Sequence, residues 1–261
     1  MKIIRCLWGK PNHQFKEKDL NFFHNECHQT KKIDEKYDLK NQMVIVWDEI
    51  NLELMETLGY PYHYMGESSE MVIEYNFLHK LLALKKSMEL YDEVLFLDWD
   101  FHIQKSLDQY FFDTLKNGND IQMPLYFYPK ELITLFKNME LDDKNVSSYY
   151  NNLYHQMTTH CKWNFQDGLV IPNAGFIYCR DKDFVTNIID IQKKHNITTN
   201  IEEICSMIYF NSIVNGLEEY LEKIEPIVCN GKIDSEMMGK QILLNNYTTK
   251  KLNKDIYFIH E

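Results

Sequence analysis

The sequence predicts an α/β fold with a mixed, mainly parallel sheet flanked by helices. Short β-type runs alternate with segments whose apolar residues recur at helical intervals, in the order strand, helix, strand, helix. A long amphipathic segment, Met71 to Tyr91, then leads at once into the apolar run of VLFLDWDFHI. A helix that feeds a buried strand is the unit of a parallel sheet covered by helices.

Each further element rests on a local pattern of apolar and turn-forming residues. In the first part of the chain we expect strands at 2–8, 43–48 and 60–65, with helices at 16–32 and 51–59. Beyond Phe112 the pattern loosens, and PLYFYP with the polar patch near Asn145 predicts a flexible loop or lid. DGLVIPNAGFIYCR predicts two short strands that meet at 172–175. Helices at 181–195 and 201–214 and a last strand, IYFIHE, complete the expected order.

The length and the composition of the chain limit the classes of protein to which it can belong. The chain has 261 residues, enough for a full core, and no internal repeat, so we expect one continuous domain. The first residues predict a strand, and no long apolar run occurs, so we expect no signal peptide and no membrane span. The six cysteines are scattered, which disfavours a disulfide framework and favours a cytoplasmic location. The net charge of −11 argues against a nucleic-acid footprint spread over the surface, with a local basic groove as the open alternative.

The stretch VLFLDWDFHI ends an apolar run with two carboxylates, Asp98 and Asp100. If the chain stays extended through them, both project to one face while Trp99 points the other way. Two negative charges held that close repel each other, which favours a cation between them or a proton on one of them. In a parallel sheet this is also the edge where ligands bind. The pattern predicts a divalent cation site, with a solvated strand end or a helix cap as the alternative.

Four features in this order resemble the GT-A glycosyltransferases: the amphipathic helix, the strand YDEVLFLDWD, the segment PNAGFIYCR, and a terminal strand ending in histidine. Most similar are the glycogenin-like and capsule-type enzymes, whose DxD motif is matched by Asp98-Trp99-Asp100. The resemblance covers about the whole chain, with DxD and NAG as its specific elements. It implies a single domain with a nucleotide-sugar-binding half (about 1–103) and an acceptor-binding half (about 104–261). It implies a GT-A (Rossmann-like) fold and a metal-dependent transferase that moves a sugar from a nucleoside-diphosphate donor to an acceptor hydroxyl. Retention at the anomeric carbon is suggested as well.

The resemblance also implies a metal site. Departure of a nucleoside diphosphate leaves negative charge on phosphate, which Mn²⁺ or Mg²⁺ absorbs as a Lewis acid. Asp100 would be the direct ligand, Asp98 would serve ribose and metal, and His260 would be the third ligand, which favours Mn²⁺. A histidine near a chain end is otherwise simply exposed. His102 is left out of the metal set, because such a residue usually packs under the sheet edge.

Further roles follow residue by residue. The expected nucleotide-sugar contacts are Trp8, Lys10, Asp48, Lys80, Asp98 and Trp99; the sugar and acceptor contacts are Asn173, Ala174 and Gly175; the catalytic set is Asp98, Asp100, Asp167 and Glu203. The relatives often clamp the diphosphate with a lysine after the histidine; here Lys10, Lys80 or a loop lysine would have to act. Alternatives stay open: Trp8 as a core residue, NAG as an ordinary turn, and Glu202 or Glu203 as partners of a helix dipole.

The partners expected are a nucleotide-sugar donor, with UDP-sugars favoured, and a saccharide, glycolipid or protein acceptor, with nucleic acid less favoured. A sugar-nucleotide pyrophosphorylase is a second enzyme class, but GKPNHQFKEKD lacks its Gly- and Arg-rich phosphate loop. A non-catalytic nucleotide- or carbohydrate-binding module is a third possibility. His24, Cys27 and His28 have metal-ligand spacing on a helix, yet a solvated helix surface is favoured because no fourth ligand is evident.

Overall fold

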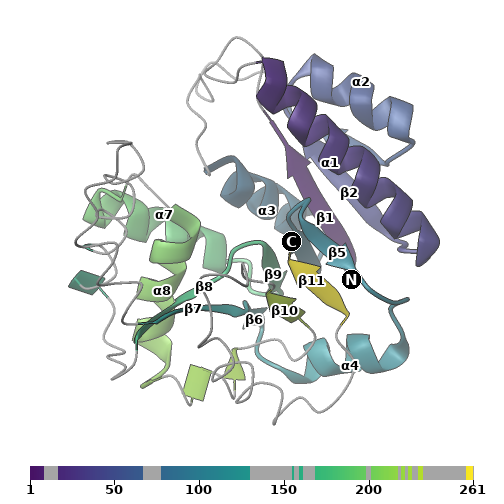
Figure 1. Ribbon diagram of the computed structural model, residues 1–261. Coiled ribbons are helices and arrows are strands. Elements are labelled where there is room, and N and C mark those ends of the chain that lie inside the picture. Colours follow the sequence, from purple (N-terminus) through teal and green to yellow (C-terminus); the bar gives the residue numbers. More distant parts are fainter. Residues whose placement is uncertain are drawn as a thin grey trace.

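The chain forms one large sheet and two small ones, with helices on both faces of the large sheet (Figure 1). The computed structural model describes residues 1–8, 17–66, 78–129, 155, 159–160, 168–197, 201–216, 219–220, 223–224, 229–231 and 257–260. The helices are α1 Glu17–Lys36, α2 Glu49–Leu58, α3 Leu78–Leu90, α4 Gln109–Asn117, α7 Phe184–His195 and α8 Ile201–Ile213. The strands are β1 Lys2–Leu7, β2 Gln42–Val46, β3 Tyr62–Tyr64, β4 Val94–Leu97, β5 Phe101–Ile103, β6 Ile121–Gln122, β7 Leu125–Pro129, β8 Gly168–Pro172, β9 Phe176–Cys179, β10 Cys229–Gly231 and β11 Phe258–His260.

The large sheet has the strand order β3-β2-β1-β4-β9-β6. Strands β3, β2, β1 and β4 are parallel to one another. Helices α1, α2 and α3 lie in the connections between them along the chain, as the crossover between parallel strands requires. Strand β9 is antiparallel to both of its neighbours, β4 and β6. The predicted mixed, mainly parallel sheet is therefore confirmed. The carboxyl ends of β1, β2 and β4 lie at one edge of the sheet.

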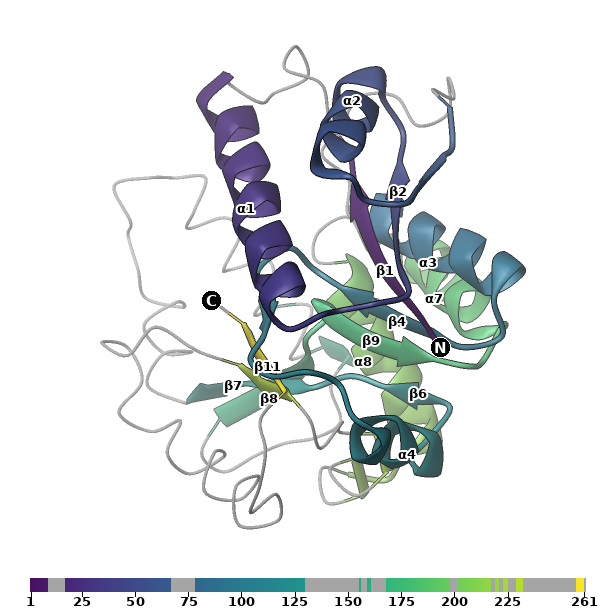
Figure 2. The same cartoon turned by 90° about the vertical axis from the view of Figure 1, so that its right-hand side faces the viewer.

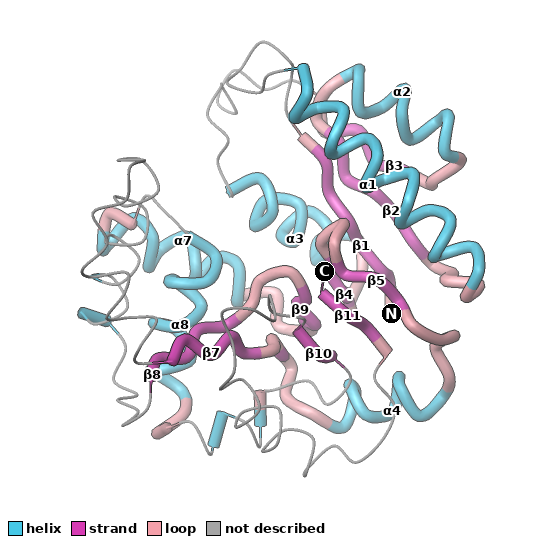
Figure 3. The backbone as a smooth tube through the Cα atoms, in the orientation of Figure 1, coloured by secondary structure: helices cyan, strands magenta, loops and turns pink. Residues whose placement is uncertain are grey.

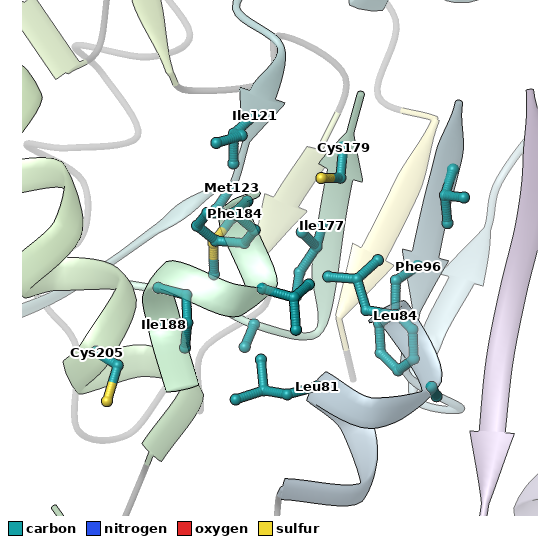
Figure 4. Close-up of a cluster of buried hydrophobic side chains, with 14 of the residues drawn as sticks. Leu81, Leu84, Phe96, Ile121, Met123, Ile177, Cys179, Phe184, Ile188 and Cys205 are labelled. Carbon is teal, nitrogen blue, oxygen red and sulfur yellow. The ribbon is translucent and has the colours of Figure 1, made fainter. Parts of the chain in front are cut away.

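Alternate residues of the central strands pack into different cores, as the two-residue period of a strand requires. In β4, Val94 and Phe96 face a core formed with α3, α7 and α8 (Figure 4). Leu95 and Leu97 face the opposite core, which includes residues of α4 and β11. A four-residue strand with both faces buried has to be apolar throughout, which explains the uninterrupted run VLFL.

The helices lie on both faces of the large sheet, so each face is covered (Figure 2). Leu81, Leu84 and Met88 of α3 are buried in the same core as Phe96, which confirms the apolar face predicted for this helix. On the other face, Cys27 of α1 packs with residues of α2 and β2. Helix α2 begins at the N-cap Asp48 and ends at Gly59, whose φ of 68° is the left-handed conformation that glycine adopts without strain.

A three-stranded sheet of order β10-β11-β5 places the last described strand beside the middle of the chain (Figure 3). Strand β5 follows β4 after a short turn, and β11 pairs with β5 in antiparallel register. The Tyr257 hydroxyl also donates to Asp108 Oδ1 at 2.7 Å, which ties the segment before β11 to the N-terminus of α4. The last strand therefore lies beside the residues that follow Asp100.

The stretch after Phe112 is more regular than predicted. Helix α4 continues to Asn117 and the short strand β6 follows it. PLYFYP contains strand β7, which pairs with β8 in a two-stranded sheet. Residues 130–154, with the polar patch, and residues 71–77 of the predicted long helix lie outside the described residues. The other predicted strands and helices are confirmed, with ends that differ by a few residues.

Candidate active site

Asp98, Trp99 and Asp100 form a turn between β4 and β5. The Phe101 amide donates to the Asp98 carbonyl at 3.2 Å, which closes the turn, and the Asp98 amide donates to the Gly175 carbonyl at 2.8 Å. The condition that the chain stays extended through both aspartates is therefore not met, so strand alternation does not place their side chains. A turn of this kind presents neighbouring side chains by its own geometry and not by strand alternation. The position of the pair, at the carboxyl edge of the sheet, is as predicted.

The turn is anchored by Trp99, which points into the protein. Its indole Nε1 donates to the Cys6 carbonyl of β1 at 2.8 Å, and its ring packs edge-on against Tyr60. The Trp99 carbonyl accepts from the Thr30 hydroxyl of α1 at 2.7 Å. The predicted nucleotide contact of Trp99 stays a prediction, while its structural role is evident.

Lys80 supplies a positive charge next to the turn. Its Nζ donates to Asp98 Oδ2 at 2.7 Å and lies 3.3 Å from Glu202 Oε1. The lysine is 4% exposed and the glutamate 1%, so these two side chains join α3 to the first turn of α8 below the surface, next to the partly exposed Asp98. Asp98 thus has a cationic partner within the protein. Lys80 would have to leave this pair to contact a diphosphate directly, and its predicted clamp role stays a prediction.

The cluster sets the ionisation of its members. Burial alone disfavours a charged Lys80, but the negative charges of Asp98, Glu202 and Glu203 outweigh it and raise the lysine pKa well above its ordinary value. Burial and the neighbouring charge of Glu203 raise the pKa of the Glu202 carboxyl. The raised lysine pKa keeps Lys80 charged in its pair with Asp98, and the raised pKa of Glu202, which the Lys80 charge opposes, favours the protonated form of that carboxyl. Strongly shifted pKa values of buried, charged partners are characteristic of functional sites.

Glu202 belongs to the site but was missing from the predicted catalytic set, which included Glu203 as its one glutamate. Both lie in the acidic first turn of α8, so their sequence positions give no reason to choose between them. In the structure Glu202 faces inward to Lys80, whereas Glu203 is partly exposed and acts on the cluster through its charge. The catalytic role of Glu203 stays a prediction.

His260 lies beside the turn, at the level of the backbone. In the β5–β11 ladder it is the register partner of Phe101, the residue that follows Asp100. The sequence placed His260 near the two aspartates only through the family resemblance, and the strand pairing brings its backbone there. Its side chain lies outside what the structure describes. Across the described side chains, no three His, Cys, Asp or Glu residues gather as a metal-binding group.

The NAG segment is built into the fold behind the turn. Asn173 Oδ1 accepts from the Gly175 amide at 2.8 Å, and the asparagine and Ala174 are buried. A Cβ on Gly175 would overlap the Phe101 ring, so only glycine fits this close approach. These contacts match the alternative of a structural turn. Contact of Asn173, Ala174 or Gly175 with a sugar stays a prediction.

Three aromatic rings lie at the carboxyl ends of β1 and β2. Trp8 follows β1 and stacks on His79 of α3, with ring centroids 5.2 Å apart and planes 4° from parallel. Trp47 follows β2 and meets both rings edge-on. Trp8 was predicted at a nucleotide site, but Trp47 and His79 were not. An aromatic residue after each of two neighbouring strands is a signal that the sequence already offered.

Other predicted residues have plain structural positions or lie outside the described chain. Both carboxylate oxygens of Asp48 accept from Asn51, so this side chain caps α2, and its base or ribose contact stays a prediction. Lys10 and Asp167 lie outside the described residues. Cys27 is fully buried in a core, and burial raises the pKa of its thiol, which is the opposite of what a metal ligand needs.

Comparison with known proteins identifies the fold. No family model and no curated protein matches the sequence. Among solved structures, the galactosyltransferase LgtC in complex with donor and acceptor sugar analogues matches all of this chain and 86% of its own, with a TM-score of 0.51 and 12% identity. The bifunctional glycosyltransferase WbbM matches 99% of this chain and 45% of its own, with a TM-score of 0.50 and 12% identity. The chain has the GT-A fold of these glycosyltransferases, which confirms the predicted fold class.

The helices of the described chain are too short or too polar to be membrane segments. None of them combines the length and the apolar composition that crossing a bilayer requires.

Proposed function

We propose that the protein is a metal-dependent glycosyltransferase that moves a sugar from a nucleoside-diphosphate sugar to an acceptor hydroxyl. One observation carries the proposal: a turn with two carboxylates, Asp98 and Asp100, follows the central strand β4 of a GT-A fold at the carboxyl edge of its sheet. Ligands of open α/β sheets bind at this edge. The fold alone supports the class of enzyme only by analogy, so the site has to carry the chemistry.

The donor atoms at the turn fit a hard divalent cation. Carboxylate oxygens are the ligands that Mg²⁺ and Mn²⁺ prefer, and the Asp98 side chain is 30% exposed. Asp98, Asp100 and His260 would hold the ion. When bound, it would act as a Lewis acid for the charge that develops on the leaving diphosphate.

The chain's own residues would hold this site ready. Lys80 orients Asp98 through the 2.7 Å ion pair, and the buried Glu202 fixes the lysine from its other side. Because the ion pair balances the charge of Asp98, the site tolerates two neighbouring carboxylates before any ligand arrives. The aromatic group of Trp8, Trp47 and His79 would form a wall of the base site, since it lies at the same edge of the sheet.

Donor and acceptor are finer parts of the proposal. The resemblance favours a UDP-sugar, and retention of the anomeric configuration follows from the same source. The acceptor would be a saccharide, a glycolipid or a protein. Product analysis by NMR decides the configuration, because the coupling constant of the anomeric proton differs between the two products.

The variant Asp100→Asn tests the metal role. The substitution keeps the size of the side chain and removes one anionic oxygen ligand. Transfer and metal-dependent donor hydrolysis should therefore fall by about two or more orders of magnitude, the usual effect on rate of losing one contact that stabilises the transition state. Release of nucleoside diphosphate from a panel of nucleotide sugars, with Mn²⁺, with Mg²⁺ and with EDTA, is the measurement.

Asp92→Asn is the matched control, because Asp92 is almost fully exposed and pairs with Lys182 on the surface. Its activity should equal that of the wild type. Full turnover of Asp100→Asn, or turnover that EDTA leaves unchanged, contradicts the proposed metal site. Binding of a nucleotide sugar without release of nucleoside diphosphate would instead identify a binding module.

A further inference from the structure

Arg5 is a charged residue in the middle of the central strand β1. Strand β1 lies between β2 and β4 in the sheet, and Arg5 is 1% exposed. A buried guanidinium is costly unless its donors and its charge are satisfied. Its neighbours therefore indicate what the arginine is for.

Those neighbours are the backbone of the Asp98–Asp100 turn. One terminal nitrogen of Arg5 donates to the Asp98 carbonyl, and the other lies 3.4 Å from the Phe101 carbonyl. The guanidinium carbon is 5.3 Å from the centre of the Trp99 ring, within range for a cation–π contact. One side chain thus spans the turn from its first residue to the residue after its last.

Two further contacts hold the arginine and the turn in place. Asp34 of α1, itself buried, lies 3.5 Å from Arg5 and accepts from the Tyr60 hydroxyl at 2.8 Å. Thr30, one helical turn earlier on α1, donates to the Trp99 carbonyl between the two carbonyls that Arg5 contacts. Helix α1 and strand β1 together therefore bind three carbonyl oxygens of one short segment.

We propose that Arg5, assisted by Thr30, is a positioning residue that holds the Asp98–Asp100 turn in the conformation that binds a divalent cation. The inference rests on the proposed function. Its contacts to the turn are with carbonyl oxygens and an indole ring, so the arginine acts through the backbone that carries the carboxylates. A planar guanidinium can reach two carbonyls at once, whereas the single ammonium of a lysine cannot keep the same geometry.

The test is a titration of Mn²⁺ into the full chain, with free Mn²⁺ counted by electron paramagnetic resonance. Arg5→Lys keeps the charge and loses the fork, so its dissociation constant for Mn²⁺ should rise about ten- to a hundredfold, as for other residues that orient metal ligands. Saturating Mn²⁺ should restore most of the donor hydrolysis. Ile3→Ala is the matched control, because Ile3 lies on the same face of β1 and packs in the core. It should lower the melting temperature without changing Mn²⁺ affinity.

Thr30→Val provides a second measurement that does not depend on the folding of Arg5→Lys. It replaces one hydroxyl with a methyl group of similar size and should weaken Mn²⁺ binding in the same direction. Unchanged affinity in Arg5→Lys or in Thr30→Val overturns the positioning role, as does an equal loss in Ile3→Ala. A wild-type chain that binds no Mn²⁺, alone or with UDP, overturns the proposed metal-dependent function and the role of Arg5 with it.

Discussion

At the scale of residues, the site is an arrangement of charges that balance each other. Lys80 lies between Asp98 and Glu202, with the closer contact to the aspartate. The two neighbouring carboxylates of the motif predicted either a bound cation or a raised pKa of one carboxyl, because either would reduce their repulsion. The structure relieves the charge of Asp98 with a lysine from α3 and raises the pKa of a third carboxyl, that of Glu202. Neither partner is adjacent to the aspartates in the sequence, so neither could be assigned from the motif.

The raised pKa of Glu202 predicts a pH dependence of stability. In the unfolded chain this carboxyl loses its proton near its ordinary pKa of 4.5, whereas the raised pKa in the native protein lets it keep the proton to higher pH. The native state then binds more protons, so the free energy of unfolding falls as pH rises above 4.5, until the native group also ionises. Glu202→Gln removes this term. Relative to the variant, the wild type should lose up to about 1.4 kcal/mol per pH unit.

Urea unfolding at intervals between about pH 5 and pH 8 provides the measurement. Glu89→Gln is the control, because Glu89 is exposed and pairs with Lys86 on the surface. Its stability should run parallel to that of the wild type at every pH. A parallel course for Glu202→Gln would show that Glu202 is ionised in the native protein.

At the scale of elements, the site depends on segments that cross the sheet edge close together. The β8–β9 connection passes behind the Asp98–Asp100 turn, and the Gly175 carbonyl accepts from the Asp98 amide. The Phe101 ring fills the space next to Gly175 and is itself fully buried. The two connections therefore fit together only if residue 175 has no side chain.

Gly175→Ala should destabilise the protein by about 1–3 kcal/mol, the usual cost of adding a methyl group to a filled core. The new Cβ would overlap the Phe101 ring, which is fully buried. Chemical denaturation measures the change in the free energy of unfolding.

Gly216→Ala is the control for this substitution. Apart from the glycine itself and its two chain neighbours, no heavy atom of the described chain lies within 4 Å of the place that its methyl group would occupy. The stability of this variant should stay within about 0.5 kcal/mol of the wild type. Equal stabilities of the two alanine variants would contradict the close fit at Gly175.

At the scale of the whole molecule, the fold gathers one edge of the sheet from distant parts of the chain. Strands β1, β2 and β4 end there, and β11 returns from the end of the described chain to pair with β5. The edge therefore holds carboxylates, aromatic rings and the backbone of His260 within one region. A ligand that bridges them would stabilise the whole chain, because it binds only the folded state.

A nucleotide sugar with Mn²⁺ should therefore raise the melting temperature. At a concentration of about 100 times its dissociation constant, the ligand adds about 2.7 kcal/mol to the free energy of unfolding. A thermal-shift screen of UDP-, GDP- and other nucleotide sugars, each with Mn²⁺ and with EDTA, identifies the donor. The shift should vanish in EDTA. A shift of equal size with EDTA would mean that the nucleotide binds without the cation.

The order of strands and helices, and the place of the two aspartates at the end of a buried strand, could be predicted from the amino-acid sequence. Local periodicity indicates which side chains are buried, and an uninterrupted apolar run such as VLFL indicates a buried strand without knowledge of the segments that pack on it. Three features emerged from the packing of the folded chain: Asp98 and Asp100 lie in a turn, Glu202 faces Lys80, and Arg5 holds the turn by its carbonyl oxygens. These contacts join residues far apart in the sequence, and their geometry depends on how the elements pack, which no local pattern records.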